Sequence, residues 1–118
     1  EREPSWKYAE GYTKDGSTND ELIAGAVSAA RASMISVVVI GLPDAYESEG
    51  FDRESMALPN GMLSLVREVA AVAPKSVVVL LGGSPMEVPF ADEVDALVWA
   101  GLGGQGCGEA LDDVLRGI

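Results

Sequence analysis

Residues 35–42 read ISVVVIGL, and residues 76–81 read SVVVLL. Both stretches are short, rich in β-branched side chains and free of charged residues, and neither alternates between apolar and polar positions. Such a pattern is typical of parallel strands that are buried on both faces of a sheet. The two stretches therefore predict a parallel β-sheet at the centre of the fold.

Apolar residues recur at helical spacing before each of these stretches. The first series occupies residues 22–30 and predicts a helix that ends near residue 33. Thr18 and Glu21 have the spacing of a capping box, which predicts that Thr18 is the N-cap of this helix. The second series occupies residues 62–70, and Pro74 ends it. Helices and strands therefore alternate along the chain.

The alternation continues towards the C-terminus. Residues 96–100 predict a third strand, a glycine-rich turn follows at 101–108, and a last helix is expected from about 109 to 116, while residues 6–9 predict an initial strand. Short connections of this kind imply right-handed crossovers and a sheet covered on both faces. We predict an α/β fold: a three-layer, flavodoxin-like sandwich with a mostly parallel sheet flanked by helices. Residues 1–118 would form a single but incomplete domain, because so few strands leave open edges.

Composition excludes several classes of function. The 118 residues are 47% hydrophobic, and 8 basic against 19 acidic side chains give a net charge of −11. This charge argues against nucleic acid or an anionic membrane as a partner, because both require basic surface. The chain has no His and one Cys, Cys107, which excludes His-dependent nucleophiles, nearly all zinc sites and an internal disulfide. We expect no metal and no cofactor.

Neither a membrane anchor nor a signal peptide is visible in the sequence. Uncharged stretches such as 32–43 and 76–86 are shorter than the roughly 20 residues that a membrane helix needs. The polar N-terminus is followed by no apolar region. The expected location is the cytoplasm, unless a targeting sequence precedes residue 1.

The loop after the first predicted strand carries an unusual group of charges. Residues 46–53 read YESEGFDR, with three carboxylates and one arginine. Asp52 and Arg53 can anchor the loop by charge-assisted hydrogen bonds, and Gly50 permits a sharp turn that projects Glu49. Clustered carboxylates favour the protonated form, which a general acid needs. From the residues alone, an acidic surface loop is the other interpretation that stays open.

Ordered motifs over nearly the whole chain resemble a known family. They are Glu-x-Glu-Gly-aromatic-Asp-Arg at 47–53, Leu-Pro at 58–59, Gly-x-Pro-x-Glu at 83–87, Gly-Gln-x-x-Gly at 104–108 and Ala-x-x-Asp-Val-Leu-x-Gly at 110–117. Their order and intervals resemble the C-terminal α/β-sandwich domain of glycoside hydrolase family 3, the β-glucosidase and β-xylosidase family.

The resemblance implies a catalytic role for this loop. In that family the domain donates the acid/base glutamate, which by alignment is Glu49, with Glu47 as the second choice. The implied reaction is retaining hydrolysis of terminal, non-reducing β-linked sugars. The nucleophilic aspartate belongs to a preceding barrel domain that this chain lacks. The barrel and a carbohydrate are thus the expected partners, and the chain alone is expected to be inactive.

The neighbours of Glu49 receive roles from the same resemblance. Tyr46 and Phe51 flank the loop and are expected to bind substrate, since apolar sugar faces stack on aromatic rings, although packing against the barrel is an alternative. Asp52 and Arg53 are expected to anchor the loop. An alternative function on the same sandwich is a noncatalytic carbohydrate-binding or interaction module. Surface normally covered by the barrel is expected to make the isolated chain self-associate.

Overall fold

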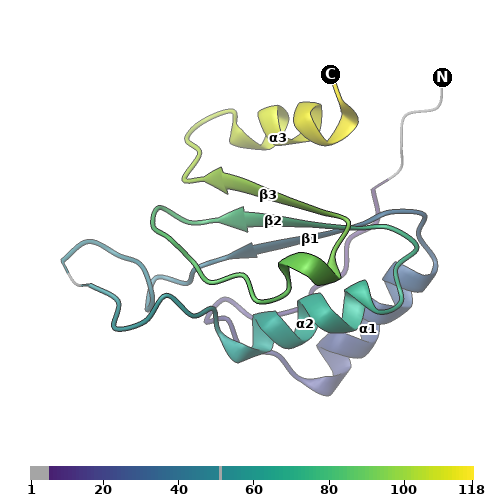
Figure 1. Ribbon diagram of the computed structural model, residues 1–118, viewed down its shortest axis with the longest axis horizontal. Coiled ribbons are helices and arrows are strands. Elements are labelled where there is room, and N and C mark those ends of the chain that lie inside the picture. Colours follow the sequence, from purple (N-terminus) through teal and green to yellow (C-terminus); the bar gives the residue numbers. More distant parts are fainter. Residues whose placement is uncertain (1–5, 51) are drawn as a thin grey trace.

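A computed structural model describes residues 6–50 and 52–118 of the chain. In chain order its elements are α1 (Asp20–Arg31), β1 (Ser36–Gly41), α2 (Asn60–Ala70), β2 (Ser76–Leu81), the short 3-10 helix η1 (Ala91–Glu93), β3 (Ala96–Gly101) and α3 (Cys107–Arg116). The strands form one parallel sheet in the order β1-β2-β3 (Figure 1). The predicted parallel α/β fold is therefore confirmed.

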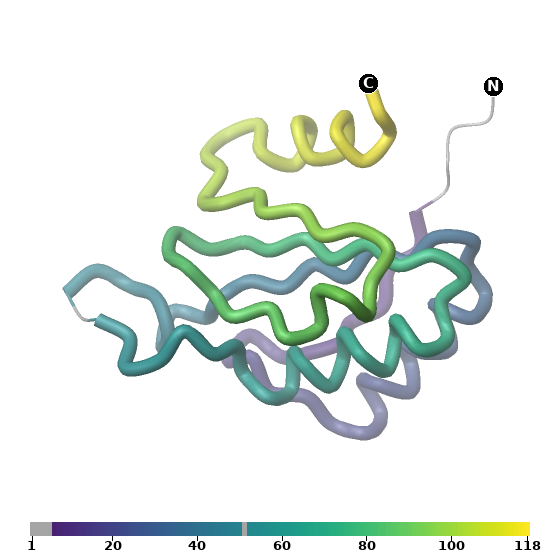
Figure 2. The backbone as a smooth tube through the Cα atoms, viewed as in Figure 1, coloured from purple at the N-terminus to yellow at the C-terminus, as the bar shows by residue number. Residues whose placement is uncertain are grey.

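The register of the sheet brings the ends of all three strands to one edge. Gly41 of β1 is paired with Leu81 of β2, and Leu81 is paired with Gly101 of β3. The pairing shifts between Leu80 and Leu81, and Gly101 has a φ of +64°, a conformation that favours glycine. Because the strands are parallel, the segments that follow them all leave from this carboxyl edge. Figure 2 shows the loop after β1 reaching far beyond it.

The core lies between the sheet and the pair α1 and α2. Both helices lie on the same side of the sheet, whereas α3 lies beside β3 on the other side (Figure 1). The fully buried side chains at this interface come from strands, helix α2 and the segment before η1, and they are Ile40, Met62, Val66, Val78 and Phe90. Helix α3 has no buried residue. The packing therefore ties β1, β2 and α2 together most firmly.

Burial on both faces holds for the middle strand alone. Adjacent residues in a strand point to opposite faces, and Val78 and Val79 of β2 are both 0% exposed. In β1, by contrast, Val39 is 41% exposed, and no residue of β3 is buried. The prediction of a sheet covered on both faces is thus wrong for β1 and β3 within the described residues, because α1 and α2 cover one face and α3 packs loosely.

Two local predictions at the N-terminal side are also wrong. Asn19, not Thr18, is the N-cap of α1: its side-chain Oδ1 accepts a hydrogen bond of 2.9 Å from the N–H of Leu22. The Thr18 hydroxyl instead donates to the carbonyl of Gly11 at 2.7 Å. The predicted initial strand at residues 6–9 is not formed, and this segment pairs with no strand of the sheet. In the described part of the chain, no helix has the length and apolar character needed to cross a membrane.

Candidate active site

Two loops lie side by side at the carboxyl edge of the sheet. One follows β1 and spans residues 42–59, and the other follows β2 and spans residues 82–90. The N–H of Glu87 donates to the carbonyl of Met56 at 2.9 Å, which ties the second loop to the returning part of the first. The first loop ends at Pro59, which is buried. The acidic segment of the sequence therefore lies over the end of β2.

The carboxylate of Glu47 is held by the loop after β2. The N–H of Gly83 donates to both Oε1 and Oε2 at 2.9 Å, and the Ser84 hydroxyl donates to Oε1 at 2.8 Å. These donors, first the Gly83 N–H and then the Ser84 hydroxyl, with a smaller effect from the charge of Arg53, lower the pKa of Glu47 below its usual range. Glu47 is therefore a charged acceptor in this structure.

Arg53 contacts the same loop from the other end of the acidic segment. Its Nη2 donates to the Ser84 hydroxyl at 2.9 Å and also to the carbonyl of Pro85. The Ser84 hydroxyl thus accepts from Arg53 and donates to Glu47. Asp52 is exposed, and in residues 6–50 and 52–118 no hydrogen bond or ion pair of its side chain is found. The anchoring contacts are made by Arg53 and Glu47.

Glu49 lies between these two contacts and has a different environment. Its side chain is exposed, and it forms no hydrogen bond or ion pair with any other described residue. Gly50, which follows it, has a φ of +96°, which residues with a Cβ rarely adopt. The backbone therefore turns sharply directly after Glu49. Phe51, which was expected to bind substrate, lies outside the described residues.

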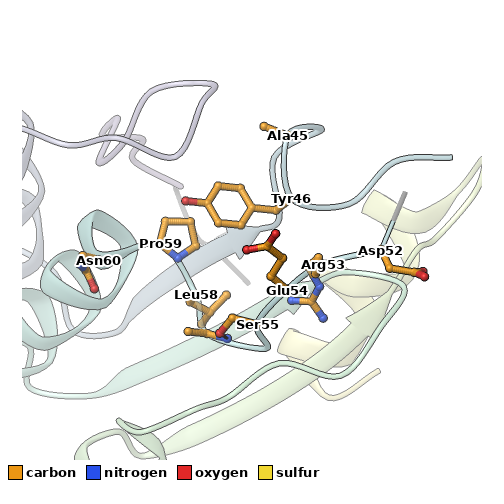
Figure 3. Close-up of a pocket in the computed structure, with 10 residues that line it drawn as sticks. Ala45, Tyr46, Asp52, Arg53, Glu54, Ser55, Leu58, Pro59 and Asn60 are labelled. Atoms are coloured by element: carbon orange, nitrogen blue, oxygen red, sulfur yellow. Dashed lines mark hydrogen bonds between the residues drawn. The ribbon is translucent and has the colours of Figure 1, made fainter. Parts of the chain in front are cut away.

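Hollows flank the acidic segment. One has a volume of about 490 Å³ and reaches Pro59, and the other has a volume of about 660 Å³ and reaches Ser84. Figure 3 shows the first, with the ring of Tyr46 beside Pro59 and Asp52 at the far end. Tyr46 is 37% exposed. The residues that line both hollows are Tyr46, Asp52, Arg53, Glu54 and Ser55.

Sequence analysis missed the part that the second loop plays in this site. Ser84 entered the sequence analysis only as the variable position of the Gly-x-Pro-x-Glu motif, yet its hydroxyl bridges Glu47 and Arg53. Gly83 supplies the N–H that Glu47 accepts, and a Cβ on it would lie 3.1 Å from Glu47 Oε1. The available signal was the position of both residues directly after a strand, at the edge where the acidic loop also lies.

The side chains of this site do not form a metal centre. Within the described ranges, no group of three or more His, Cys, Asp or Glu side chains is close enough together to hold a metal ion. What the site offers instead is one exposed carboxyl group beside a network of charge-assisted hydrogen bonds, at the open edge of a parallel sheet. A carboxyl group in such a place can exchange protons with a bound molecule.

Comparison with known sequences places this α/β domain and its acidic loop in a family. The family model described as "Glycosyl hydrolase family 3 C-terminal domain" matches residues 5–118. The chain therefore belongs to the family of glycosyl hydrolase family 3 C-terminal domains, as its motifs predicted.

The chain is similar to β-glucosidases from several organisms. It is 50% identical to thermostable β-glucosidase B of Acetivibrio thermocellus over 93% of this chain and 15% of that protein. Among solved structures, a β-glucosidase of the same family from Bifidobacterium adolescentis superposes with a TM-score of 0.87 at 40% identity, over 92% of this chain and 16% of that one. The β-glucosidase of Kluyveromyces marxianus, crystallised in complex with glucose, gives a TM-score of 0.78 at 42% identity. This match covers 83% of this chain and 12% of that one. The chain thus spans a small fraction of these relatives.

Proposed function

We propose that the chain is the acid/base-donating domain of a retaining β-glycosidase that hydrolyses terminal, non-reducing β-linked sugars. The observation that carries the proposal is the contrast between the two glutamates of the loop: Glu47 is held by three hydrogen bonds, whereas Glu49 is exposed and unpaired among the described residues. Membership of the family and the similarity to β-glucosidases support it.

Glu49 would act in both steps of the reaction. In the first step, a carboxylate from another part of the longer protein attacks the anomeric carbon, while Glu49 gives its proton to the departing glycosidic oxygen. In the second step, Glu49 takes a proton from water as the water oxygen bonds to the anomeric carbon and releases the carboxylate. The two carboxyl groups must lie roughly 5–5.5 Å apart, so the loop has to reach another domain.

Glu47 is poorly suited to this role. A general acid must carry a proton before it can donate it, but the hydrogen bonds from Gly83 and Ser84 favour the charged form of Glu47 and lower its pKa. Turning Glu47 towards a substrate would also leave the Gly83 N–H and the Ser84 hydroxyl without their acceptor. These contacts favour Glu49 as the acid/base residue.

The other loop residues would shape the sugar site. Tyr46 is partly exposed and lines both hollows, so its ring offers a wall on which a sugar face can stack. Phe51, which lies outside the described residues, keeps the proposed role of binding substrate. Arg53 would anchor the loop through the contacts described above, and Asp52 would complete the anchoring in the longer protein.

The remaining partner would be the domain that supplies the nucleophile. Trp99, Leu102 and Val114 are more than half exposed, and they lie in β3, in the turn after it and in α3. Large exposed apolar side chains at the open β3 edge of a sheet are typical of surface that another part of a longer protein covers. Because this chain would supply the acid/base residue and another domain the nucleophile, we propose that the chain alone has no glycosidase activity.

The test is the Glu49→Ala variant of the full-length protein. Loss of the acid should lower kcat/KM by about 10²–10⁴-fold on disaccharides, which have poor leaving groups, and far less on dinitrophenyl glycosides, which need little protonation. Azide should restore turnover of the activated substrate by replacing the water that Glu49 no longer activates. Equal losses on both substrates, or the same pattern in Glu47→Ala with azide rescue, would contradict the assignment of Glu49.

The alternative, a noncatalytic sugar-binding module, has its own outcome. The hollows beside Tyr46 are formed by this chain alone, which is the observation in its favour. If the chain binds glucose without any other domain and Tyr46→Ala abolishes the binding, while Glu49→Ala leaves hydrolysis by the full-length protein unchanged, the module is the better description.

A further inference from the structure

The acidic segment is fixed at both ends to one short stretch of the loop after β2. Glu47 accepts hydrogen bonds from residues 36 and 37 positions further along the chain, and Arg53 donates to residues 31 and 32 positions further along. Both sets of contacts converge on residues 83–85. We call these contacts of Glu47 and Arg53 with Gly83, Ser84 and Pro85 the clasp.

Glu49 lies within the short segment that the clasp closes. Hydrogen bonds at Glu47 and at Arg53 restrict where the intervening backbone can run, and the left-handed Gly50 sets its turn. Among residues 6–50 and 52–118, no hydrogen bond or ion pair holds the side chain of Glu49. Its position therefore depends on contacts made by its neighbours in sequence.

Glycine at position 83 allows the carboxylate of Glu47 to approach the backbone of the loop after β2 closely. A Cβ on Gly83 would lie 3.1 Å from Glu47 Oε1 and 2.7 Å from a methyl carbon of Leu102, so glycine leaves room for the carboxylate to reach the backbone. The Gly83 N–H donates to both carboxylate oxygens, and charged acceptors make hydrogen bonds roughly twice as strong as neutral ones. A neutral amide at position 47 would replace this interaction only in part.

We propose that Glu47 is a positioning residue: through the clasp it holds Glu49 where its proton can reach the glycosidic oxygen. The inference rests on the proposed role of Glu49. It assigns Glu47 no contact with substrate, because its carboxylate is occupied by Gly83 and Ser84.

The position of an acid matters most when the leaving group needs its proton. A displacement of about 1 Å in a catalytic group can cost about 10²-fold in rate. Loss of the clasp should therefore impair cleavage of disaccharides strongly and of dinitrophenyl glycosides weakly. A variant that merely lowers the amount of folded protein lowers both rates by the same factor.

The experiment measures kcat/KM of the full-length protein on both substrates for Glu47→Ala, Ser84→Ala and Glu49→Ala. Glu47→Ala is expected to lose about 10²-fold on the disaccharide, with near wild-type values on the activated glycoside, and Ser84→Ala a smaller loss of the same kind. Glu47→Gln, which keeps one carbonyl acceptor, should fall between wild type and Glu47→Ala. Asp44→Asn, an exposed carboxylate of the same loop outside the clasp, is the matched control and should behave as wild type.

The outcomes separate this inference from the proposed function. If Glu49→Ala shows the leaving-group dependence and Glu47→Ala and Ser84→Ala show none, the clasp has no positioning role and the proposed function stands. If Glu49→Ala shows no such dependence, the proposed function fails, and the inference fails with it. Should Glu47→Ala not fold, the result for Ser84→Ala decides.

Discussion

The indole N–H of Trp99, in β3, donates a hydrogen bond to the carbonyl of Gly82 at 3.1 Å, although 64% of the tryptophan is exposed. The N–H of Gly82 in turn donates to the carbonyl of Gly101 at 3.1 Å. Both polar groups of Gly82 are therefore bound to β3 directly before Gly83 and Ser84. The start of the loop that contacts Glu47 is fixed by the end of the neighbouring strand.

Replacing Trp99 by Phe should lower stability modestly. The variant keeps an aromatic ring but removes the N–H that donates to the carbonyl of Gly82, a buried residue. An unpaired buried carbonyl costs about 1–3 kcal/mol, less if water reaches it. Urea denaturation should therefore give a free energy of unfolding about 1 kcal/mol below wild type. Trp6→Phe is the control, because Trp6 is exposed and makes no hydrogen bond with the described residues; an equal loss there would contradict the role of the Gly82 contact.

Asp95 joins the starts of β2 and β3, and its removal should make stability less sensitive to acid. Its Oδ2 accepts from the Ser76 N–H at 2.8 Å, and Lys75 Nζ lies 3.1 Å from Oδ1. The Ser76 N–H first, and then Lys75, lower the pKa of Asp95. A lowered folded-state pKa means that the contribution of Asp95 is complete above its usual pKa of 3.8 and is lost as pH falls through the folded-state value.

We therefore expect Asp95→Ala to have a lower Tm than wild type at pH 7, with the difference shrinking below about pH 4. Asp92→Ala is the control, because Asp92 is exposed and lies in the same connection without a hydrogen bond to the described residues. Thermal melts from pH 2.5 to 8 measure both. A Tm difference that does not change with pH would show that the charge of Asp95 contributes nothing.

Most of the fold could be predicted from the sequence, because the relevant patterns are local. Continuous β-branched runs indicated β1 and β2, and helical spacing indicated α1 and α2. Burial of β1 and β3 could not be predicted, because it depends on which other elements cover them. The predicted strand at residues 6–9 failed for a similar reason: strand formation needs a partner edge, which a local pattern does not reveal.

The site was predictable only in part. The sequence indicated the acidic loop and its place after a strand, and the family resemblance singled out Glu49 and Glu47. The different environments of these two glutamates depend on Gly83 and Ser84, which lie more than 30 residues away and whose contacts are long-range. Motif spacing describes one segment of the chain, whereas the clasp is formed between two.

Two glycines without a role in the site should respond in opposite ways to alanine. Gly25 lies inside α1, and a Cβ added to it would meet nothing within 4 Å, so Gly25→Ala should raise the free energy of unfolding by about 0.8–1 kcal/mol through helix propensity. A Cβ on Gly11 would lie 2.8 Å from Leu65 Cδ1, and Leu65 is buried and cannot move aside freely. Gly11→Ala should therefore lose about 1–3 kcal/mol by overpacking. Urea denaturation of both variants tests this, and changes of the same sign would contradict it.

The isolated chain should self-associate through the region formed by β3 and α3. Leu102 is 74% exposed and Val114 is 62% exposed, and burying such side chains against a second copy is favourable. The net charge of −11 opposes this association, so added salt should strengthen it. Analytical ultracentrifugation should show oligomers that increase with protein and salt concentration, and the double variant Leu102→Lys and Val114→Lys should shift the chain towards monomer. Met34→Lys, at a still more exposed position between α1 and β1, is the control; a monomeric wild type at high concentration and high salt would show that these side chains do not drive association.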